Sequence, residues 1–229
     1  MRNNWCWLLL SAAAAAATAA HATPPARVEI AYEIARNGST VAEVVHRMQH
    51  NGRIYQLTET WKGRGIFALR GSAKRSSRGI VSPEGLKPLE FLDERTGRNT
   101  ARANFDWEAK RLTMQYRGEP RNEPLPARAH DRLAYLFDFA FAPPRPGGEI
   151  TFDLMDGRGQ SRHVYSVNGR ERLKTPAGEF DTIRVEKRTA DELAQIWLAA
   201  ELSHLPLRIL VVHKDGTRYD QVATKISTE

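Results

Sequence analysis

The sequence contains a single cysteine, and this scarcity limits how the fold can be held together. That residue is Cys6, close to the amino terminus, and the chain offers it no second cysteine to pair with. A small domain held together by disulfides is therefore excluded, and a hydrophobic core must stabilise the fold. The 229 residues are enough to build such a core within one domain.

The motifs of common hydrolases and metalloenzymes are also missing. No Gly-x-Ser-x-Gly turn is present to carry a nucleophilic serine, and no cysteine follows residue 22. The histidines are scattered, and His46 and His50 lie in a strand pattern that separates them by about 13 Å. Gly63-x-Gly65 lacks the rest of a phosphate-binding loop. We therefore expect no metal, no cofactor and no enzymatic activity.

An uncharged run near the amino terminus has the composition of a secretory signal. Arg2 precedes it, leucine and alanine dominate residues 5–20, and Ala20-His21-Ala22 forms a small-x-small cleavage site. The run is roughly 16 residues long, shorter than the ~20 that a membrane-spanning helix needs. Cys6 lies before most of it, whereas a lipid-modified cysteine would follow it. We expect cleavage between Ala22 and Thr23 and a soluble periplasmic product, with an uncleaved anchor as the alternative.

The chain is basic, with a formal net charge of +7 that falls to +6 when Arg2 is removed. Export excludes nucleic acid as the partner and leaves lipid headgroups, lipopolysaccharide phosphates, cell-wall polymers or envelope proteins. Peripheral contact with a membrane is compatible with this charge. The simpler alternative is that the charge only keeps the protein soluble.

Alternating apolar residues and tight-turn signals predict a β-rich domain over residues 23–229. Val28, Ile30, Tyr32 and Ile34 alternate with residues of smaller or polar side chain, as in a half-buried strand. Five Asn-Gly or Asp-Gly pairs predict reversals of the chain: Asn37-Gly38, Asn51-Gly52, Asp156-Gly157, Asn168-Gly169 and Asp215-Gly216. The expected fold is one antiparallel, strongly curved sheet, a half-barrel or open barrel.

One segment breaks the strand pattern. Apolar residues at helical spacing predict a helix near residues 129–141, and a Pro/Gly-rich loop should follow over 142–148. The apolar stripe of this helix is wide enough to pack on or into the concave side of the sheet.

Two sequence motifs in the second half of the chain resemble those of a known family. The first is Thr175-Pro176-Ala177-Gly178-Glu179-Phe180-Asp181-Thr182, and the second runs from Trp197 to Glu201 and continues with Leu205-Pro206-Leu207-Arg208-Ile209. With Phe105-Asp106-Trp107 and the expected helix, they resemble the DUF3108 family of exported bacterial proteins. The resemblance implies an exported, β-rich domain and no particular reaction.

The residues of these motifs have the properties expected of structural positions. Thr175, Pro176 and Gly178 form a turn signal before a strand that begins at Phe180. Trp197 has the spacing of a core residue, and Pro206 suits a strand start or edge. Arg208 interrupts an apolar run, so it either faces solvent or lies in a cavity that holds an anion.

The stretch from Lys62 to Arg78 is the one most suggestive of binding. It holds six basic residues and no acidic one, beside Trp61 and Phe67. Such a mixture could meet the headgroup and the tail of an amphiphile, although a solvated strand pair would show the same pattern. The candidate ligand contacts are Trp61, Phe67, Phe137 and Trp197, with Arg64, Arg70 or Arg208 near a headgroup.

The sequence is compatible with three functions. The leading hypothesis is an envelope module that binds a lipophilic or amphiphilic ligand in a half-barrel cavity. The second is a structural or scaffold protein with a filled interior. The third is a hydrolase of envelope polymers, which would need acid and base groups that converge in one pocket.

Overall fold

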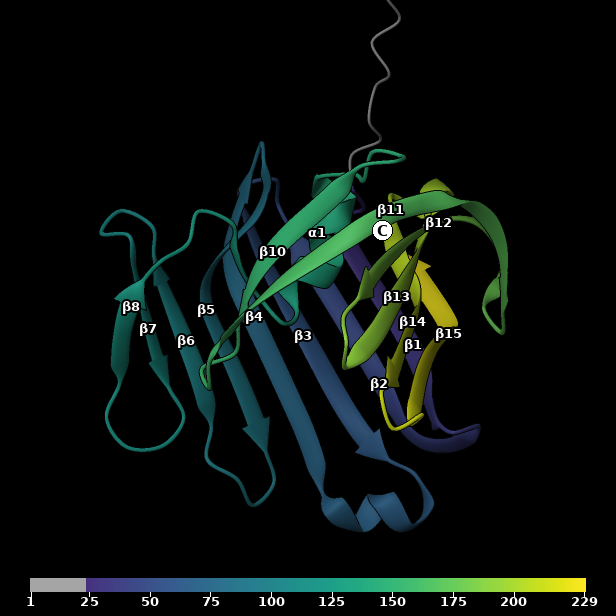
Figure 1. Ribbon diagram of the computed structural model, residues 1–229, viewed down its shortest axis with the longest axis horizontal. Helices are drawn as coiled ribbons and strands as arrows, with labels where there is room; N and C mark the ends of the chain where they lie inside the picture. The colour runs from purple at the N-terminus through teal and green to yellow at the C-terminus, as the bar shows by residue number, and fades with distance from the viewer. Residues whose placement is uncertain (1–23) are drawn as a thin grey trace, which may run out of the picture.

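The computed structural model describes residues 24–229, apart from the side chain of Arg70. The signal segment expected over residues 1–22, with its cleavage site before Thr23, lies outside these residues. The described chain forms strands, one α-helix and two short 3-10 helices (Figure 1). The first half holds β1 (Arg27–Arg36), β2 (Ser39–His50), β3 (Ile54–Gly63), η1 (Gly65–Arg70), β4 (Ser72–Ser82), β5 (Gly85–Arg95), β6 (Ala101–Asp106), β7 (Arg111–Gln115) and β8 (Arg121–Pro124). The second half holds β9 (Ala129–Asp131), α1 (Ala134–Phe141), β10 (Glu149–Met155), β11 (Gln160–Thr175), β12 (Gly178–Arg188), β13 (Glu192–Ala199), η2 (Ala200–Leu202), β14 (Leu205–His213) and β15 (Arg218–Thr228).

The strands of the described chain form one 15-stranded sheet in which two meanders meet at the centre. The order is β8-β7-β6-β5-β4-β3-β2-β1-β15-β14-β13-β12-β11-β10-β9. The described chain enters the sheet at its centre with β1, runs outward to the edge strand β8, continues at the opposite edge with β9 and returns to the centre with β15. The pairing of β1 with β15 joins the two meanders.

The short connection between the two edge strands requires the sheet to curl. Only residues 125–128 separate β8 from β9, so the edges are at most about 18 Å apart at this point. Side-chain contacts confirm the approach: Ser77 of β4 donates a hydrogen bond to Asp131 of β9 at 2.5 Å. The sheet is therefore an open barrel, and the predicted mainly-β fold with one curved sheet is confirmed. All described strand pairs are antiparallel except β9 with β10.

Helix α1 fills the concave side of this sheet. Its buried residues lie on nearly every side of the helix: Ala134, Leu136, Phe137, Asp138, Phe139 and Ala140. The helix begins at Ala134, five residues later than expected, because residues 129–131 pair with β10 as a parallel strand. Asp131 then accepts hydrogen bonds from the backbone N–H groups of Leu133 and Ala134, which satisfies donors at the helix start. Residues 142–148 form a loop after it, where a Pro/Gly-rich loop was expected.

Four of the five predicted reversals are confirmed, and one is wrong. Asn37 and Gly38 have φ values of 49° and 85°, the left-handed pair that a tight hairpin needs. The pairs at 51–52, 156–157 and 215–216 also lie between antiparallel strands. Asn168-Gly169 does not reverse the chain, because β11 continues through it. The register against β12 shifts between Val167 and Arg170, so the pair forms a bulge in the strand.

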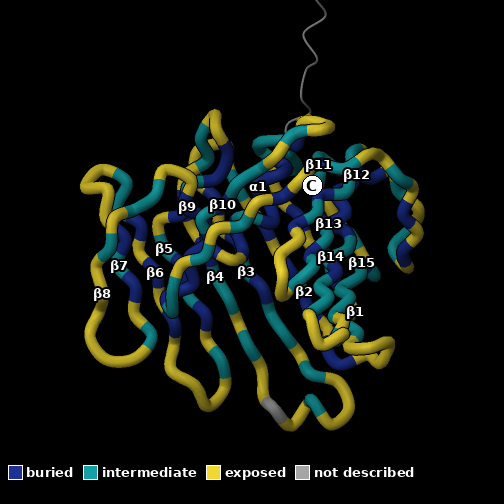
Figure 2. Tube along the Cα trace, viewed as in Figure 1, coloured by how far each residue is buried: buried dark blue, intermediate teal, exposed yellow. Residues whose placement is uncertain are grey.

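In β1, the apolar side chains that alternate along the sequence all point into the core. Val28, Ile30, Tyr32 and Ile34 are all buried in β1, and Figure 2 shows buried and exposed positions along the strands. Tyr32 also donates a hydrogen bond of 2.6 Å to the carbonyl oxygen of Pro206, which lies two strands away in β14. This bond links the central strand to the second meander.

A row of ionisable side chains crosses four neighbouring strands on the concave face. His46, Glu59, Arg75 and Asp93 occupy directly paired positions on β2, β3, β4 and β5, so their side chains share one face. Glu59 lies 2.8 Å from both His46 Nε2 and Arg75 Nη1, and Arg75 Nε lies 3.5 Å from Asp93. We call these four residues the polar ladder.

Asp93 is the last residue of the polar ladder, and three guanidinium groups contact its carboxylate. Arg95 and Arg158 lie 2.7 and 2.9 Å from its carboxylate, in addition to Arg75. Burial by itself would raise the pKa of Asp93, but the hydrogen bonds from Arg95 and the charges of the three arginines outweigh it and lower the pKa to about 2. Arg158 belongs to the turn between β10 and β11, so this carboxylate fastens the second meander onto β5.

Replacing Asp93 tests this fastening. Asp93→Asn removes the buried anion that three guanidinium groups share, although Arg75 keeps a buried partner in Glu59, and we expect it to lower the free energy of unfolding by about 3 kcal/mol. The matched control is Asp191→Asn, which removes a carboxylate paired with Lys214 on the surface and should cost less than about 1 kcal/mol. Urea unfolding at neutral pH measures both. Equal effects of the two variants would contradict the role given to Asp93.

The low pKa of Asp93 also predicts how stability depends on pH. The carboxyl has a pKa of about 2 in the folded protein and about 3.9 when unfolded, so its stabilising effect is complete above about pH 5 and is lost as the pH falls toward 2. The loss should be about 2 kcal/mol. Asp93→Asn has no carboxyl to titrate at this position. The difference in free energy of unfolding between the wild type and Asp93→Asn should therefore shrink as the pH falls from about 5 toward 2. A difference that stays constant would show that Asp93 does not titrate in this way.

Candidate ligand pocket

A pocket of about 440 Å³ opens at the end of the barrel where η1 connects β3 to β4. Residues of β1, β2, β3, η1, β4, β5 and β15 line it, together with the turn between β5 and β6. The pocket therefore depends on the β1–β15 pairing and on the curl that brings these strands together. We call it the η1 pocket.

Three aromatic residues form its apolar wall: Trp61 of β3, Phe67 of η1 and Tyr219 of β15. The indole Nε1 of Trp61 is buried and has no hydrogen-bond partner among the described residues. Phe67 reaches the pocket because η1 folds back over Gly63, where any Cβ would overlap the carbonyl oxygen of Phe67. Glycine at position 63 is thus required by a close backbone approach.

Three arginines lie beside this wall: Arg36 of β1, Arg95 of β5 and Arg98 in the β5–β6 turn. The Arg36 guanidinium lies 5.9 Å from the centre of the Tyr219 ring, and Arg95 is held by Asp93 of the polar ladder. Arg98 is exposed and has no ion pair within the described chain. No acidic side chain lines the pocket, so it presents an aromatic surface next to arginines, of which Arg95 is paired with Asp93 outside the pocket lining and Arg98 has no ion pair in the described chain.

A second hollow, of about 670 Å³, differs in its chemistry. Its lining includes Glu84, Asp138 and Glu149 as well as basic residues. Asp138 accepts a hydrogen bond of 2.6 Å from the backbone N–H of Leu86 and lies 3.4 Å from His130. Its buried charges thus have partners within the protein, and the arrangement positions α1 against β5.

The structure places two of the seven candidate ligand residues in the η1 pocket, namely Trp61 and Phe67. Arg64 lies just before η1, is more than half exposed and forms an ion pair with Glu43. The side chain of Arg70 is outside the described part of the chain. Phe137 is completely buried in α1 and packs against the ring of His46, so it belongs to the core.

Trp197 and Arg208 lie together, away from the pocket. The Arg208 guanidinium stacks 4.7 Å from the Trp197 ring centre and forms two hydrogen bonds of 2.8 Å to Asp220. Trp197 is buried and donates its indole N–H to Glu171. Arg208 thus neither faces solvent freely nor lines an anion cavity, because its counter-ion is a neighbouring carboxylate on β15.

The remaining motif residues lie at strand ends. Thr175 Oγ1 accepts the Ala177 N–H and donates to the Gly178 carbonyl in the turn between β11 and β12, where Gly178 has a φ of 140°. Phe180 pairs with Leu173. Pro206 is the second residue of β14, opposite Leu198.

Sequence reasoning missed Arg36, Arg95, Arg98 and Tyr219. They come from β1, β5, the β5–β6 turn and β15, and only the pairing of the first strand with the last brings Arg36 and Tyr219 side by side. That pairing leaves no local pattern in the sequence.

One group of side chains has a superficial likeness to catalytic machinery. Ser161 Oγ lies 3.1 Å from His163 Nε2, and Lys187 Nζ lies 3.4 Å from His163 Nδ1. Burial and the charges of Lys187 and Arg132 lower the pKa of His163 to about 4, which makes it a poor general base at neutral pH.

Within residues 24–229, no group of three or more His, Cys, Asp or Glu side chains is arranged to hold a metal ion, and no helix there has the length and apolar character of a membrane span.

The fold is similar to solved structures at low sequence identity. A β-barrel-like protein of the DUF1849 domain of unknown function from Brucella abortus superposes with a TM-score of 0.61 at 7% identity, covering 91% of this chain and 100% of that one. A candidate exported protein with a YmcC-like fold from Bacteroides fragilis gives a TM-score of 0.38 at 13% identity, with 88% and 95% covered. Only the first likeness is close enough to support the fold.

Comparison at the level of sequence is more specific. No curated protein matches the chain. A family model does match, the protein of unknown function DUF3108, and it spans residues 27–222. This range includes nearly every strand of both meanders and the two motifs around Thr175 and Trp197 that carried the resemblance. The chain therefore belongs to the DUF3108 family.

Proposed function

We propose that the protein is an exported, non-enzymatic module of the cell envelope that binds an amphiphile with an anionic headgroup in the η1 pocket. The observation that carries this proposal is the aromatic wall of Trp61, Phe67 and Tyr219 beside three arginines, with no acidic lining residue. Apolar and aromatic walls with a few convergent polar groups are typical of small-molecule sites. A volume of about 440 Å³ is in the usual range for such sites.

The charges suggest where each part of the ligand lies. Arg95 is already bound to Asp93, so it forms a fixed side of the pocket. Arg98 has no ion pair in the described chain, and it is the cation best placed to meet a headgroup. The unpartnered N–H of Trp61 offers a further donor. The tail then lies on the aromatic rings.

Export and the lack of enzymatic activity rest on separate observations. The expected signal segment over residues 1–22 supports a periplasmic protein. No histidine, cysteine or carboxylate lines the η1 pocket, so no acid and base groups converge there, which argues against hydrolysis at this site.

The scaffold alternative draws support from α1. The helix fills the concave side of the sheet, and its Phe137 and Phe139 are buried. The leading hypothesis placed a ligand in a half-barrel cavity, whereas the η1 pocket lies at the end of the barrel, beyond the packed helix. A pure scaffold would leave this pocket empty.

Native mass spectrometry separates these two functions. Protein purified from the periplasm without detergent should show a mass above that of the polypeptide, and the excess should match a lipid or another amphiphile. Phe67→Asp places a charge on the apolar wall and should abolish the excess, whereas Phe180→Asp alters a partly exposed ring outside the pocket and should leave it unchanged. Purified protein that carries no ligand and binds no apolar fluorescent probe would support the scaffold function instead.

Titration with defined amphiphiles tests the headgroup preference. Dodecyl phosphate should bind and change the tryptophan fluorescence, and Trp61→Phe should remove most of that change. Arg98→Glu should weaken binding about tenfold or more, because it reverses a charge at the pocket. Arg53→Glu reverses an exposed arginine in the β2–β3 turn, outside the pocket lining, and should have little effect. If uncharged dodecyl maltoside binds as tightly as the phosphate, the anionic headgroup is not recognised.

A further inference from the structure

Helix η1 carries the two most exposed large apolar side chains of the described chain. Ile66 is 77% exposed and Leu69 is 90% exposed. A 3-10 helix has three residues per turn, so side chains three residues apart lie above one another on one face. Phe67 does not share that face, and it lines the pocket. We call Ile66 and Leu69 the apolar tip.

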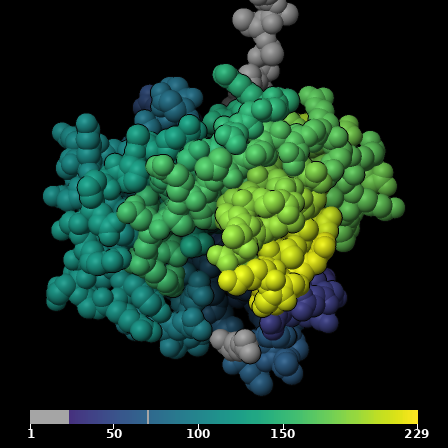
Figure 3. All heavy atoms as spheres, in the orientation of Figure 1, coloured from purple at the N-terminus to yellow at the C-terminus, as the bar shows by residue number. Residues whose placement is uncertain are grey.

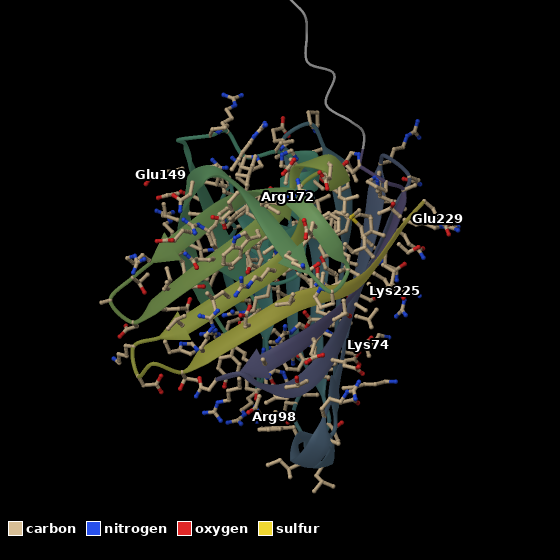
Figure 4. All side chains as sticks on the ribbon, turned by 90° about the vertical axis from the view of Figure 1, so that its right-hand side faces the viewer. Lys74, Arg98, Glu149, Arg172, Lys225 and Glu229 are labelled. Atoms are coloured by element: carbon tan, nitrogen blue, oxygen red, sulfur yellow. The ribbon has the colours of Figure 1, made fainter. Side chains whose placement is uncertain are left out.

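The apolar tip lies at a projecting end of the molecule. Figure 3 shows η1 below the body of the barrel, and the perpendicular view in Figure 4 shows it again as the lowest element, with Arg98 just above it. Because both views agree, a flat surface could meet η1 without first meeting the rest of the barrel.

Basic residues surround the apolar tip. Lys62 and Lys74 flank η1 along the chain, both are exposed, and neither forms an ion pair with another described residue. Arg98 adds a third cation from the neighbouring turn. Glu43 is paired with Arg64, and Glu94 lies opposite Lys74 in the strand register. Residues 60–83 contain no Asp or Glu, so the segment that carries η1 bears only basic charges.

We propose that the apolar tip docks on a lipid bilayer that exposes anionic headgroups. Ile66 and Leu69 enter the boundary between headgroups and acyl chains, while Lys62, Lys74 and Arg98 contact the headgroups. Apolar insertion and attraction by basic residues together are what hold peripheral proteins at such surfaces. A protein partner fits less well, because lysine is depleted in protein interfaces and two side chains provide little of the area that a stable interface needs.

Docking would also bring the η1 pocket to the membrane, because Phe67 lines the pocket from the same short helix. An amphiphile could then pass between bilayer and pocket over a short path. The docking proposal does not depend on the pocket being filled. A protein that binds vesicles but never carries a ligand would refute the proposed function and leave the docking proposal intact.

Vesicle sedimentation tests the proposal with matched variants. The purified protein should bind vesicles made of equal parts phosphatidylethanolamine and phosphatidylglycerol, and bind phosphatidylcholine vesicles far less. Ile66→Ser/Leu69→Ser should weaken binding about tenfold or more. The control is Ile54→Ser/Ile80→Ser, which alters a cross-strand pair of exposed apolar residues away from η1 and should not change binding.

The contribution of the basic residues to vesicle binding can be measured separately. Lys62→Gln/Lys74→Gln should weaken binding to the anionic vesicles and reduce its dependence on salt. Circular dichroism of each variant confirms that the fold is intact, as expected for exposed positions. Equal vesicle binding by wild type and Ile66→Ser/Leu69→Ser would overturn the proposal. So would sedimentation showing a wild-type dimer that this variant converts to a monomer, because the apolar tip would then bind a second copy of the chain.

Discussion

The fold depends on one buried carboxylate that joins two halves of a curled sheet. Asp93 lies on the first meander, and it accepts a charge-assisted contact from Arg158 in the second. This contact acts together with the Ser77–Asp131 hydrogen bond between β4 and β9 and with the helix packed inside the sheet to hold the curl. The same carboxylate orients Arg95, which lines the η1 pocket. Arg95 therefore connects the buried ion cluster around Asp93 to the η1 pocket, to which we assign ligand binding.

Charge is distributed unevenly between the core and the η1 end. In the polar ladder, each carboxylate lies beside a basic side chain on a neighbouring strand. At the η1 end the pairing is incomplete: Arg64 is paired with Glu43, whereas Lys62, Lys74 and Arg98 form no ion pair with another described residue. Paired charges stabilise the fold, whereas unpaired ones remain available to an external anion. This contrast is the reason for placing function at the end of the barrel instead of along its packed interior.

The fold was largely predictable from local sequence, and the candidate site was not. Alternation in β1 and the turn at Asn37-Gly38 depend on neighbouring residues, so they can be read from the chain. Asn168-Gly169 has the same composition as a turn, but strand pairing with β12 favours a bulge, and local sequence cannot reveal that pairing. Trp61 and Phe67 stood out because a basic stretch adjoins them. Tyr219 and Arg36 come from opposite ends of the chain and meet only through tertiary structure.

The central pairing of β1 with β15 also constrains how the protein reaches its native state. Among the described strands, the earliest in the sequence occupies the middle of the sheet, and its partner β15 is the latest. Until β15 arrives, β1 has an open, apolar edge that could pair with another chain. Contacts between residues so distant in sequence slow folding and prolong this exposure. A shortened or interrupted chain would therefore lose the middle of its sheet, and such products should aggregate or require a chaperone that shields β1.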